Sequence, residues 1–297
     1  MSRIFEALQR SEAQRGGSPL SPSRASATDL LPPAERDLLD APLAFPEFAS
    51  LQVHLPPESS LVCLSASETL AAEKFRFLGV RLRQLQQQGR KLKKILVTST
   101  IPEEGKSMVS ANLAAVLSRK KPQRVLLLEG DLRRPVIGSR LGLGKLPGIS
   151  EWLREGSGQI SSIYHLENAG FWLLPAGSPP ENPLELMQTA KLAELMEQLS
   201  ALFDWIVIDS PPVLPLGDTS VWARVAEGIL LVTREGTTQK RQLKRGLEAL
   251  EQSKLLGIVF NSCSNTENNY YYYRYHPKGS PAPNRARETK PQSGADT

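Results

Sequence analysis

The chain has 297 residues, of which 40% are hydrophobic and 23% charged, enough apolar material for a folded domain with a buried core. Its 36 basic and 31 acidic residues give a net charge of +5, too small an excess to imply a nucleic-acid partner. Only two cysteines occur, far apart, so a disulfide framework and a zinc site are unsupported. No apolar run approaches the roughly 20 residues that cross a bilayer, and no secretion signal is present, so we expect a cytoplasmic chain.

The two ends of the chain differ in composition from its middle. Residues 1–15 place Ile4, Phe5 and Leu8 on one face of a short amphipathic helix. Residues 16–60 are rich in Pro, Ser and Ala and lack periodicity, which predicts a flexible linker. Residues 267–297 form a second low-complexity segment, which we expect to be a disordered tail. The globular domain is therefore predicted over residues 61–266.

Strand-like and helical patterns alternate within the predicted domain. Capping-box spacing from Ser65 to Glu68 opens a helical pattern that ends near Gly89. Apolar runs of strand type follow at residues 94–98, 124–129, 171–175, 204–209, 228–233 and 255–260. Strands that are apolar on both faces and alternate with helices predict an α/β fold with a doubly wound, mostly parallel sheet. Ligands of such sheets bind at the carboxyl ends of the strands.

A phosphate-binding loop is predicted after the first of these strands. Residues 98–107 read TSTIPEEGKS and lead into a helical pattern. A Walker A loop needs backbone N–H groups at a helix start, a lysine for the β- and γ-phosphates and a hydroxyl for magnesium. Gly105, Lys106 and Ser107 supply the last turn and both side chains.

Two features of this loop depart from the general pattern. Thr100 stands where the first glycine is expected, and Glu103 and Glu104 bring negative charge close to a bound phosphate. The alternative is a strand-to-helix turn with an incidental Gly-Lys-Ser. A strand directly before the loop, a helix directly after it and an acid at the end of a later strand favour the phosphate loop.

Acidic residues end two later strands. Asp209 closes an apolar run and precedes two prolines, as a Walker B aspartate that holds magnesium would, although an N-cap or turn aspartate is the alternative. Glu129 and Asp131 flank a glycine at the edge where the γ-phosphate is expected, and such a carboxylate can accept a proton from a hydroxyl group. Arg133 and Arg134 can meet phosphate or a neighbouring subunit, and a solvated turn fits them equally well.

A cluster of tyrosines lies in the predicted tail. Five of the six tyrosines are Tyr270, Tyr271, Tyr272, Tyr273 and Tyr275. Their polar, Pro- and Gly-rich surroundings offer no face to bury, so we expect exposed hydroxyls that can act as phosphoryl acceptors. An aromatic patch for a partner groove and base stacking on single-stranded nucleic acid are the alternatives.

These features together resemble the bacterial tyrosine kinases, the CpsD/CapB-type autokinases of capsule and exopolysaccharide assembly. The resemblance runs from about Ser67 to the tyrosine cluster and rests on three motifs. They are PEEGKS at 102–107, EGDLRRP at 129–135 and IVIDSPP at 206–212. The resemblance implies a P-loop NTPase sheet of the SIMIBI/MinD-like type.

The resemblance also implies roles for individual residues. The implied ATP contacts are Glu104, Gly105, Lys106, Ser107 and Met108. The implied Mg²⁺ ligands are Ser107, Asp209 and Glu129. The implied catalytic residues are Lys106, Asp131, Asp209 and Glu129, with Asp131 receiving the tyrosine proton.

Partners follow from the same resemblance. The family's assembly motif E-x-x-R-x-x-R is matched by Glu73 and Arg76, with Gly79 in place of the second arginine, and implies a ring-shaped homo-oligomer. A Wzz-like membrane chain-length regulator is the implied activator, which places the chain at the inner face of the plasma membrane. A cognate tyrosine phosphatase is implied as well.

The sequence therefore predicts an ATP-dependent protein-tyrosine autokinase. It would phosphorylate its own tail in trans and regulate polymerisation and export of capsular polysaccharide or exopolysaccharide. A ParA/MinD-like ATPase and a weakly catalytic ATP-binding adaptor of the polysaccharide machinery are the alternatives.

Overall fold

The computed structural model describes residues 45–55, 60–65, 68–120, 122–156, 158–215 and 217–262. The elements below belong to a compact unit that begins at Glu47. The predicted N-terminal helix, most of the predicted linker and the tyrosine cluster lie outside the described residues. In the described part of the chain, no helix is long and apolar enough to cross a membrane.

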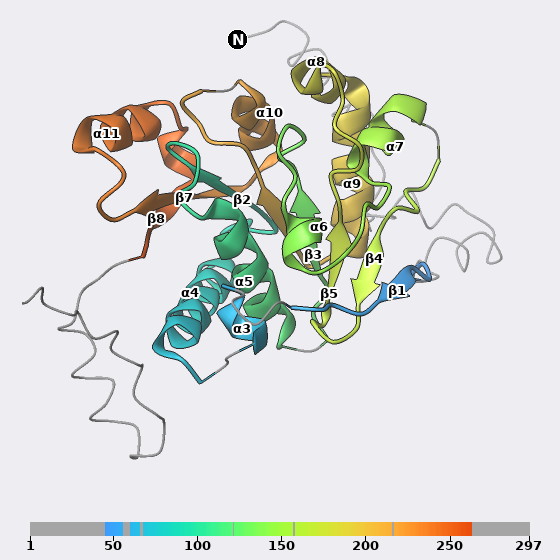
Figure 1. Cartoon of the computed structure of the whole chain (residues 1–297), viewed down its shortest axis with the longest axis horizontal. Coiled ribbons are helices and arrows are strands. Elements are labelled where there is room, and N and C mark those ends of the chain that lie inside the picture. The colour runs from blue at the N-terminus through green and yellow to red at the C-terminus, as the bar shows by residue number, and fades with distance from the viewer. Residues whose placement is uncertain are drawn as a thin grey trace, which may run out of the picture. The chain divides into compact units, whose positions relative to one another are not determined.

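One eight-stranded sheet organises the unit (Figure 1). Its strands are β1 (Ala49–Leu51), β2 (Lys94–Ser99), β3 (Val125–Glu129), β4 (Tyr164–Leu166), β5 (Phe171–Leu174), β6 (Trp205–Asp209), β7 (Gly228–Arg234) and β8 (Leu255–Asn261). Their order across the sheet is β1-β4-β5-β3-β6-β2-β7-β8, and every neighbouring pair except β4 and β5 is parallel. The predicted doubly wound, mostly parallel sheet is confirmed, and all six predicted strands form.

Helices cover both faces of the sheet. They are α3 (Val62–Ser65), α4 (Leu70–Gln87), α5 (Lys106–Ser118), α6 (Ile137–Arg140), α7 (Ile149–Glu155), α8 (Pro183–Met187), α9 (Ala190–Leu202), α10 (Asp218–Val225) and α11 (Lys240–Glu248), with a 3₁₀ turn at Gln252–Lys254. The chain leaves β2 through α5 in one direction across the sheet and returns through α9, α10 and α11 in the other. Right-handed crossovers therefore place α5 on one face and the other three on the opposite face.

The helix α5 is the centre of the main core. Eleven of its side chains are buried, from Ser107 to Ser118, because α4 and α3 pack on its outer side while the sheet covers its inner side. Alternate strand residues such as Ile95 and Val97 face this core. The buried helix and the buried end of β2 together fix the position of the loop between them.

Two short strands were not predicted. β1 lies inside the segment predicted as linker, and its parallel pairing with β4 shows that the sheet begins before residue 61. Both strands have only three residues and lack an apolar run, so their sequences give little strand signal. Tertiary contacts decide them instead, among them the rings of His165 and Trp172, whose centroids are 4.6 Å apart.

The predicted start of the first long helix is also corrected. Thr69 is the N-cap of α4, and its hydroxyl accepts the N–H of Ala72 at 3.2 Å. Ser65 instead ends the separate helix α3, where its hydroxyl donates to the carbonyl of Leu61. Serine and threonine can both cap a helix, so the sequence does not distinguish Ser65 from Thr69.

Candidate active site

The loop between β2 and α5 has the shape of an anion cradle. Gly105 is the N-cap of α5 and has φ +92°, a left-handed conformation that favours glycine. The N–H groups that follow it belong to the first helical turn and have no acceptor within the helix. With the partial positive charge of a helix N-terminus, they favour an anion such as phosphate at this point.

Glu104 lies in this loop but turns its side chain away from the cradle. Its carboxylate is fully buried, accepts the N–H of Ile101 at 2.7 Å and accepts a hydrogen bond from the hydroxyl of Thr238. The expectation that Glu104 brings its charge toward a bound phosphate is therefore wrong, because the carboxylate fastens the loop to the start of α11. Of the two glutamates, it is the exposed Glu103, with φ +66°, that lines the cavity in front of the loop.

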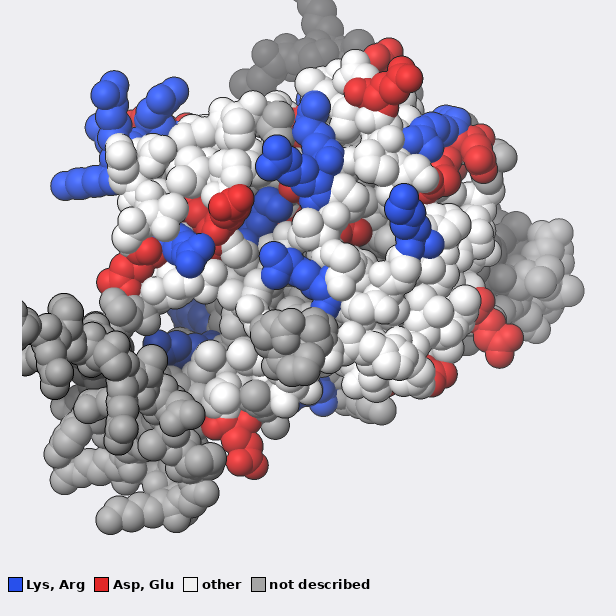
Figure 2. Space-filling model, viewed as in Figure 1, with Lys and Arg blue, Asp and Glu red and all other residues white. Residues whose placement is uncertain are grey.

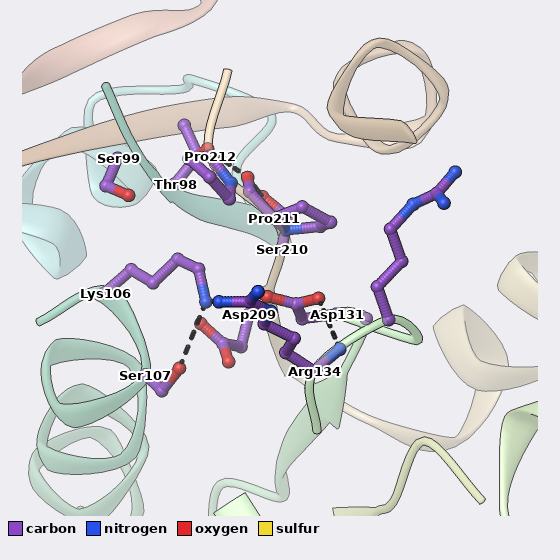
Figure 3. A network of polar contacts seen from close by, with 12 residues as sticks. Thr98, Ser99, Lys106, Ser107, Asp131, Arg134, Asp209, Ser210, Pro211 and Pro212 are labelled. Carbon is purple, nitrogen blue, oxygen red and sulfur yellow. Dashed lines mark hydrogen bonds and ion pairs between the residues drawn. The ribbon is translucent and has the colours of Figure 1, made fainter. Parts of the chain in front are cut away.

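The two acidic strand ends meet beside the loop. β3 and β6 are neighbours in register, with Glu129 opposite Asp209, so Asp131 lies just beyond this edge. Lys106 reaches across from α5, and its Nζ lies 2.9 Å from Oδ2 of Asp131 and 3.4 Å from Oγ of Ser107 (Figure 3). The structure thus brings Asp131 to Lys106 and Ser107, which lie in a different motif of the sequence.

Asp209 is completely buried at the base of this group. Its Oδ1 accepts a hydrogen bond from Ser110 at 3.2 Å, while Oδ2 has no hydrogen-bond partner in the described part of the chain. Burial raises the pKa of Asp209 from 3.8 to about 6, although Lys106 and Ser107 oppose the change. An orphaned, buried carboxylate oxygen next to a serine hydroxyl is a donor set that suits Mg²⁺, which binds few protein ligands and keeps several waters.

Glu129 has a different environment from the one its motif predicts. Its Oε1 accepts the N–H of Ile137 at 2.5 Å and its Oε2 the N–H of Ala176 at 3.2 Å. Burial raises its pKa, and the hydrogen bonds from the backbone oppose that rise. Its two carboxylate oxygens therefore hold the start of α6 and the segment after β5. We assign Glu129 a structural role, neither as a Mg²⁺ ligand nor as a catalytic residue.

Two further contacts fix the loop that carries Asp131. Arg133 makes a bidentate ion pair with Asp218 on α10, at 2.6 and 3.1 Å, and Asp218 is almost fully buried. The indole N–H of Trp222 donates to the carbonyl of Gly130 at 3.0 Å. The sequence leaves Arg133 open to a phosphate, a neighbouring subunit or solvent, and no spacing in the sequence joins it to Asp218.

A cavity of about 570 Å³ opens in front of the phosphate loop. Its lining is Pro102, Glu103, Gly105, Lys106, Ser107, Met108, Asp131, Arg133, Arg134, Val136, Arg140, Pro212 and Pro215. Four cations and two acids line it, which favours an anionic ligand.

Basic side chains are also prominent over α11 at the upper left of Figure 2, where Lys240, Arg241, Lys244 and Arg245 are exposed.

The predicted assembly residues lie on α4. Glu73 and Arg76 form an ion pair one helical turn apart, 2.7 Å between Oε2 and Nε. Gly79 faces inward, where a Cβ atom would lie 2.6 Å from Cγ1 of Val116 on α5. The close approach of α4 to α5 therefore explains why a small residue stands at this position. The predicted acceptor tyrosines lie beyond residue 262, outside the described range.

Comparisons with known proteins place this chain among kinases. It is 29% identical to the tyrosine-protein kinase YwqD of Bacillus subtilis over 73% of this chain and 91% of YwqD. It is 31% identical to CapB of Staphylococcus aureus over 76% of this chain and 94% of CapB. Against the tyrosine-protein kinase wzc of Salmonella typhimurium it is 31% identical over 74% of this chain but only 30% of the relative. No family model matches the chain.

Solved structures agree with these relatives. The kinase domain of the Escherichia coli tyrosine kinase ETK superposes with a TM-score of 0.65 at 27% identity, over 73% of this chain and 84% of that domain. The chimerical protein CapA2B2 gives 0.63 at 27% identity, over 76% and 97%. A ParA family ATPase from Chlorobium tepidum gives 0.50 at 16% identity, over 58% and 76%, which shows a shared fold and nothing more.

Proposed function

Because the chain belongs to the bacterial tyrosine kinase family, we propose that it transfers the γ-phosphoryl group of ATP to the tyrosine cluster of another copy of itself. The acceptors are Tyr270, Tyr271, Tyr272, Tyr273 and Tyr275. The observation that carries the proposal is the meeting of Lys106, Asp131 and Asp209 beside the Gly105 turn, at a cavity lined by cations.

The residues around the cavity fit a triphosphate and a magnesium ion. The first-turn N–H groups of α5 and the ammonium of Lys106 would bind phosphate oxygens. Ser107 and the orphaned Oδ2 of Asp209 would hold Mg²⁺, directly or through water. A bound Mg²⁺ supplies positive charge that offsets the charge on the β- and γ-phosphate oxygens.

Lys106 keeps its charge in this setting. Burial opposes the ammonium form, but Asp209 and Asp131 outweigh burial and raise the pKa of Lys106 above its ordinary value. These two acids thus favour the ammonium form of the side chain, which lies between the acids and the phosphate loop. When a triphosphate enters, the ammonium can exchange its ion pair with Asp131 for phosphate oxygens, which releases the carboxylate.

The released Asp131 is placed to receive a proton. In the proposed transfer, the phenolic oxygen of a tyrosine forms a bond to the γ-phosphorus while the bond from that phosphorus to the β–γ bridging oxygen breaks. The bridging oxygen leaves with ADP, and the phenolic proton passes to Asp131. The bidentate Arg133–Asp218 pair and the hydrogen bond from the Arg134 N–H to Asp131 at 3.1 Å hold the carboxylate in place.

Regulation and partners complete the proposal. The chain would control polymerisation and export of a capsular polysaccharide or exopolysaccharide, with a Wzz-like membrane chain-length regulator as its activator at the inner face of the plasma membrane. A tyrosine phosphatase would remove the phosphoryl groups by hydrolysis, which restores tyrosine and releases inorganic phosphate. Each phosphotyrosine adds close to two negative charges, so accumulated phosphate should loosen a homo-oligomer by repulsion. The family resemblance is the support for these partners.

Labelling with ATP and magnesium, followed by anti-phosphotyrosine detection, tests the reaction. The wild type should be labelled, whereas Lys106→Met and a variant with all five cluster tyrosines changed to Phe should not. Lys91→Met is the matched control, because Lys91 is exposed at the opposite end of β2. Phosphate release from the wild type without labelling would instead indicate an ATPase, and nucleotide binding without either reaction would indicate an adaptor.

Mixing two inactive variants tests transfer between copies. The five-Phe variant retains the proposed active site, and Lys106→Met retains the tyrosines, so neither should label alone. Label should appear on the Lys106→Met chain when the two are combined. No label in the mixture, with an active wild type, would contradict transfer in trans.

A further inference from the structure

The last strand of the sheet ends against the phosphate loop. At the end of β8, Nδ2 of Asn261 donates to the carbonyl of Glu104 at 2.9 Å, and Oδ1 of Asn261 accepts the N–H of Ser262 at 2.9 Å. One end of this amide must donate and the other must accept, so an asparagine satisfies both bonds and an isosteric aspartate does not. Asn261 belongs to none of the three sequence motifs.

The bond from Asn261 determines how the loop presents its backbone. A trans peptide is planar, so its C=O and N–H point in opposite directions. By holding the carbonyl of Glu104, Asn261 therefore also sets the direction of the N–H of Gly105. Within the described residues this N–H has no protein acceptor, and Gly105 lines the cavity in front of the loop.

The packing around this peptide leaves little freedom. A Cβ atom on Gly105 would lie 2.2 Å from Nδ2 of Asn261, so the contact needs a glycine there as well as the left-handed φ. On the side-chain side, the carboxylate of Glu104 is held by the N–H of Ile101 and by Thr238. Residue 104 is thus fixed from the connection between β7 and α11 and from the end of β8.

We infer that Asn261 is a positioning residue for phosphate binding, which aims the N–H of Gly105 at a bound phosphate by holding the Glu104–Gly105 peptide. The inference rests on the proposed function, since it assigns the Gly105 turn to phosphate. It adds a residue from the edge strand of the sheet, more than 150 positions from the loop in sequence, to the machinery of that loop.

The variant Asn261→Asp tests the inference by keeping the shape of the side chain and removing its donor. A carboxylate would then face the carbonyl of Glu104, so the peptide should turn away. With a fluorescent ATP analogue as the probe, affinity should fall about tenfold, and competition by inorganic tripolyphosphate should weaken by the same factor. Competition by adenosine should not change.

Two further variants control for folding and for the chemical change itself. Asn261→Ala removes both hydrogen bonds without adding a charge and should weaken tripolyphosphate competition by a smaller factor. Asn182→Asp makes the same substitution at the N-cap of α8, where a carboxylate can still accept the N–H of Glu185, and should leave nucleotide affinity unchanged. Circular dichroism then shows that each variant is folded.

The outcomes separate this inference from the proposed function. Wild-type affinity for tripolyphosphate in folded Asn261→Asp and Asn261→Ala would overturn the inference alone. A loss confined to adenosine would do the same, because it would indicate a contact with the base. A wild-type chain that binds neither ATP nor tripolyphosphate would overturn both.

Discussion

The acidic side chains in the two halves of the sheet's carboxyl edge have different hydrogen-bond partners. Beside the phosphate loop, Asp131 faces Lys106, and within the described residues Asp209 has one oxygen without a hydrogen-bond partner. Beside β3 and β5, Glu129 gives both oxygens to backbone N–H groups of Ile137 and Ala176. All three acids are buried, and Glu129 and Asp131 even come from the same motif, only two residues apart.

The difference shows that burial and position at a strand end do not by themselves make an acid available for chemistry. What matters is whether the backbone has already supplied the hydrogen bonds that the carboxylate needs. An acid with spare oxygens can take a metal ion or a proton. Asp131 can be released when Lys106 turns to a phosphate, whereas the backbone N–H groups of Ile137 and Ala176 keep Glu129 in a structural role. Four substitutions can break or sharpen this contrast.

The largest expected effect comes from Asp131→Asn. Loss of a proton acceptor should lower kcat for tyrosine labelling by roughly 10²- to 10⁴-fold. The affinity for ATP should equal that of the wild type, because Lys106 loses only its ion-pair partner and can still bind phosphate. Steady-state labelling at several ATP concentrations separates kcat from KM.

Asp204→Asn is the matched control for that substitution. Asp204 lies just before β6, at the other end of the strand, and accepts the N–H of Arg124 at 2.7 Å, which an amide oxygen can also do. Its labelling rate should equal that of the wild type. A similar loss in both variants would contradict a specific role for Asp131.

Asp209→Asn should weaken Mg²⁺-dependent binding of ATP while making the metal-free protein more stable. The folded pKa of Asp209 is about 6 against 3.8, so above pH 6 the folded state holds a charge that burial disfavours. That difference corresponds to roughly 3 kcal/mol at most. Thermal unfolding in EDTA at pH 7.5 measures it.

The pH dependence has a defined sign. The folded protein binds the Asp209 proton before the unfolded chain does, so the cost in the wild type disappears as pH falls from about 6 toward 4. The stability advantage of Asp209→Asn should therefore be largest above pH 7 and small near pH 4. An advantage that does not depend on pH would contradict this account.

Glu129→Gln tests the other half of the edge. The amide has one accepting oxygen, so either the N–H of Ile137 or that of Ala176 should face a donor, at a cost of about 1–3 kcal/mol in unfolding free energy. Denaturant unfolding measures that loss. The labelling rate per folded molecule should stay within about threefold of the wild type. A loss of rate as large as that of Asp131→Asn would instead show that Glu129 takes part in catalysis.

The smallest effect is expected from Glu103→Gly in the phosphate loop. Glu103 has φ +66°, a conformation that costs an L-residue about 1 kcal/mol and a glycine almost nothing. Stability should rise by up to about 1 kcal/mol, offset in part by the greater freedom of glycine when unfolded. Glu103→Ala keeps the strain and is the control, so an equal gain in both variants would contradict the backbone explanation.

Sequence patterns were most informative where one local property decides the structure. The six apolar runs became strands because residues that are apolar on both faces can be buried only within a covered sheet. Gly105, Lys106 and Ser107 could be found because a phosphate loop is contiguous in sequence. The strands β1 and β4 were missed because three residues carry too little periodicity, and Ser65 was mistaken for the N-cap that Thr69 provides.

The sequence by itself determined the six strands that are apolar runs, the phosphate loop and the kinship with tyrosine kinases, since these depend on neighbours along the chain. The tertiary structure alone decided which acids keep free oxygens. The carboxylate of Glu104 is held by the distant hydroxyl of Thr238 and by the nearby N–H of Ile101. That of Glu129 is held by the N–H groups of Ile137 and Ala176, whereas Oδ2 of Asp209 has no hydrogen-bond partner among the described residues. Hydrogen bonds between remote segments leave no spacing in the sequence, so they become visible only once the chain is folded.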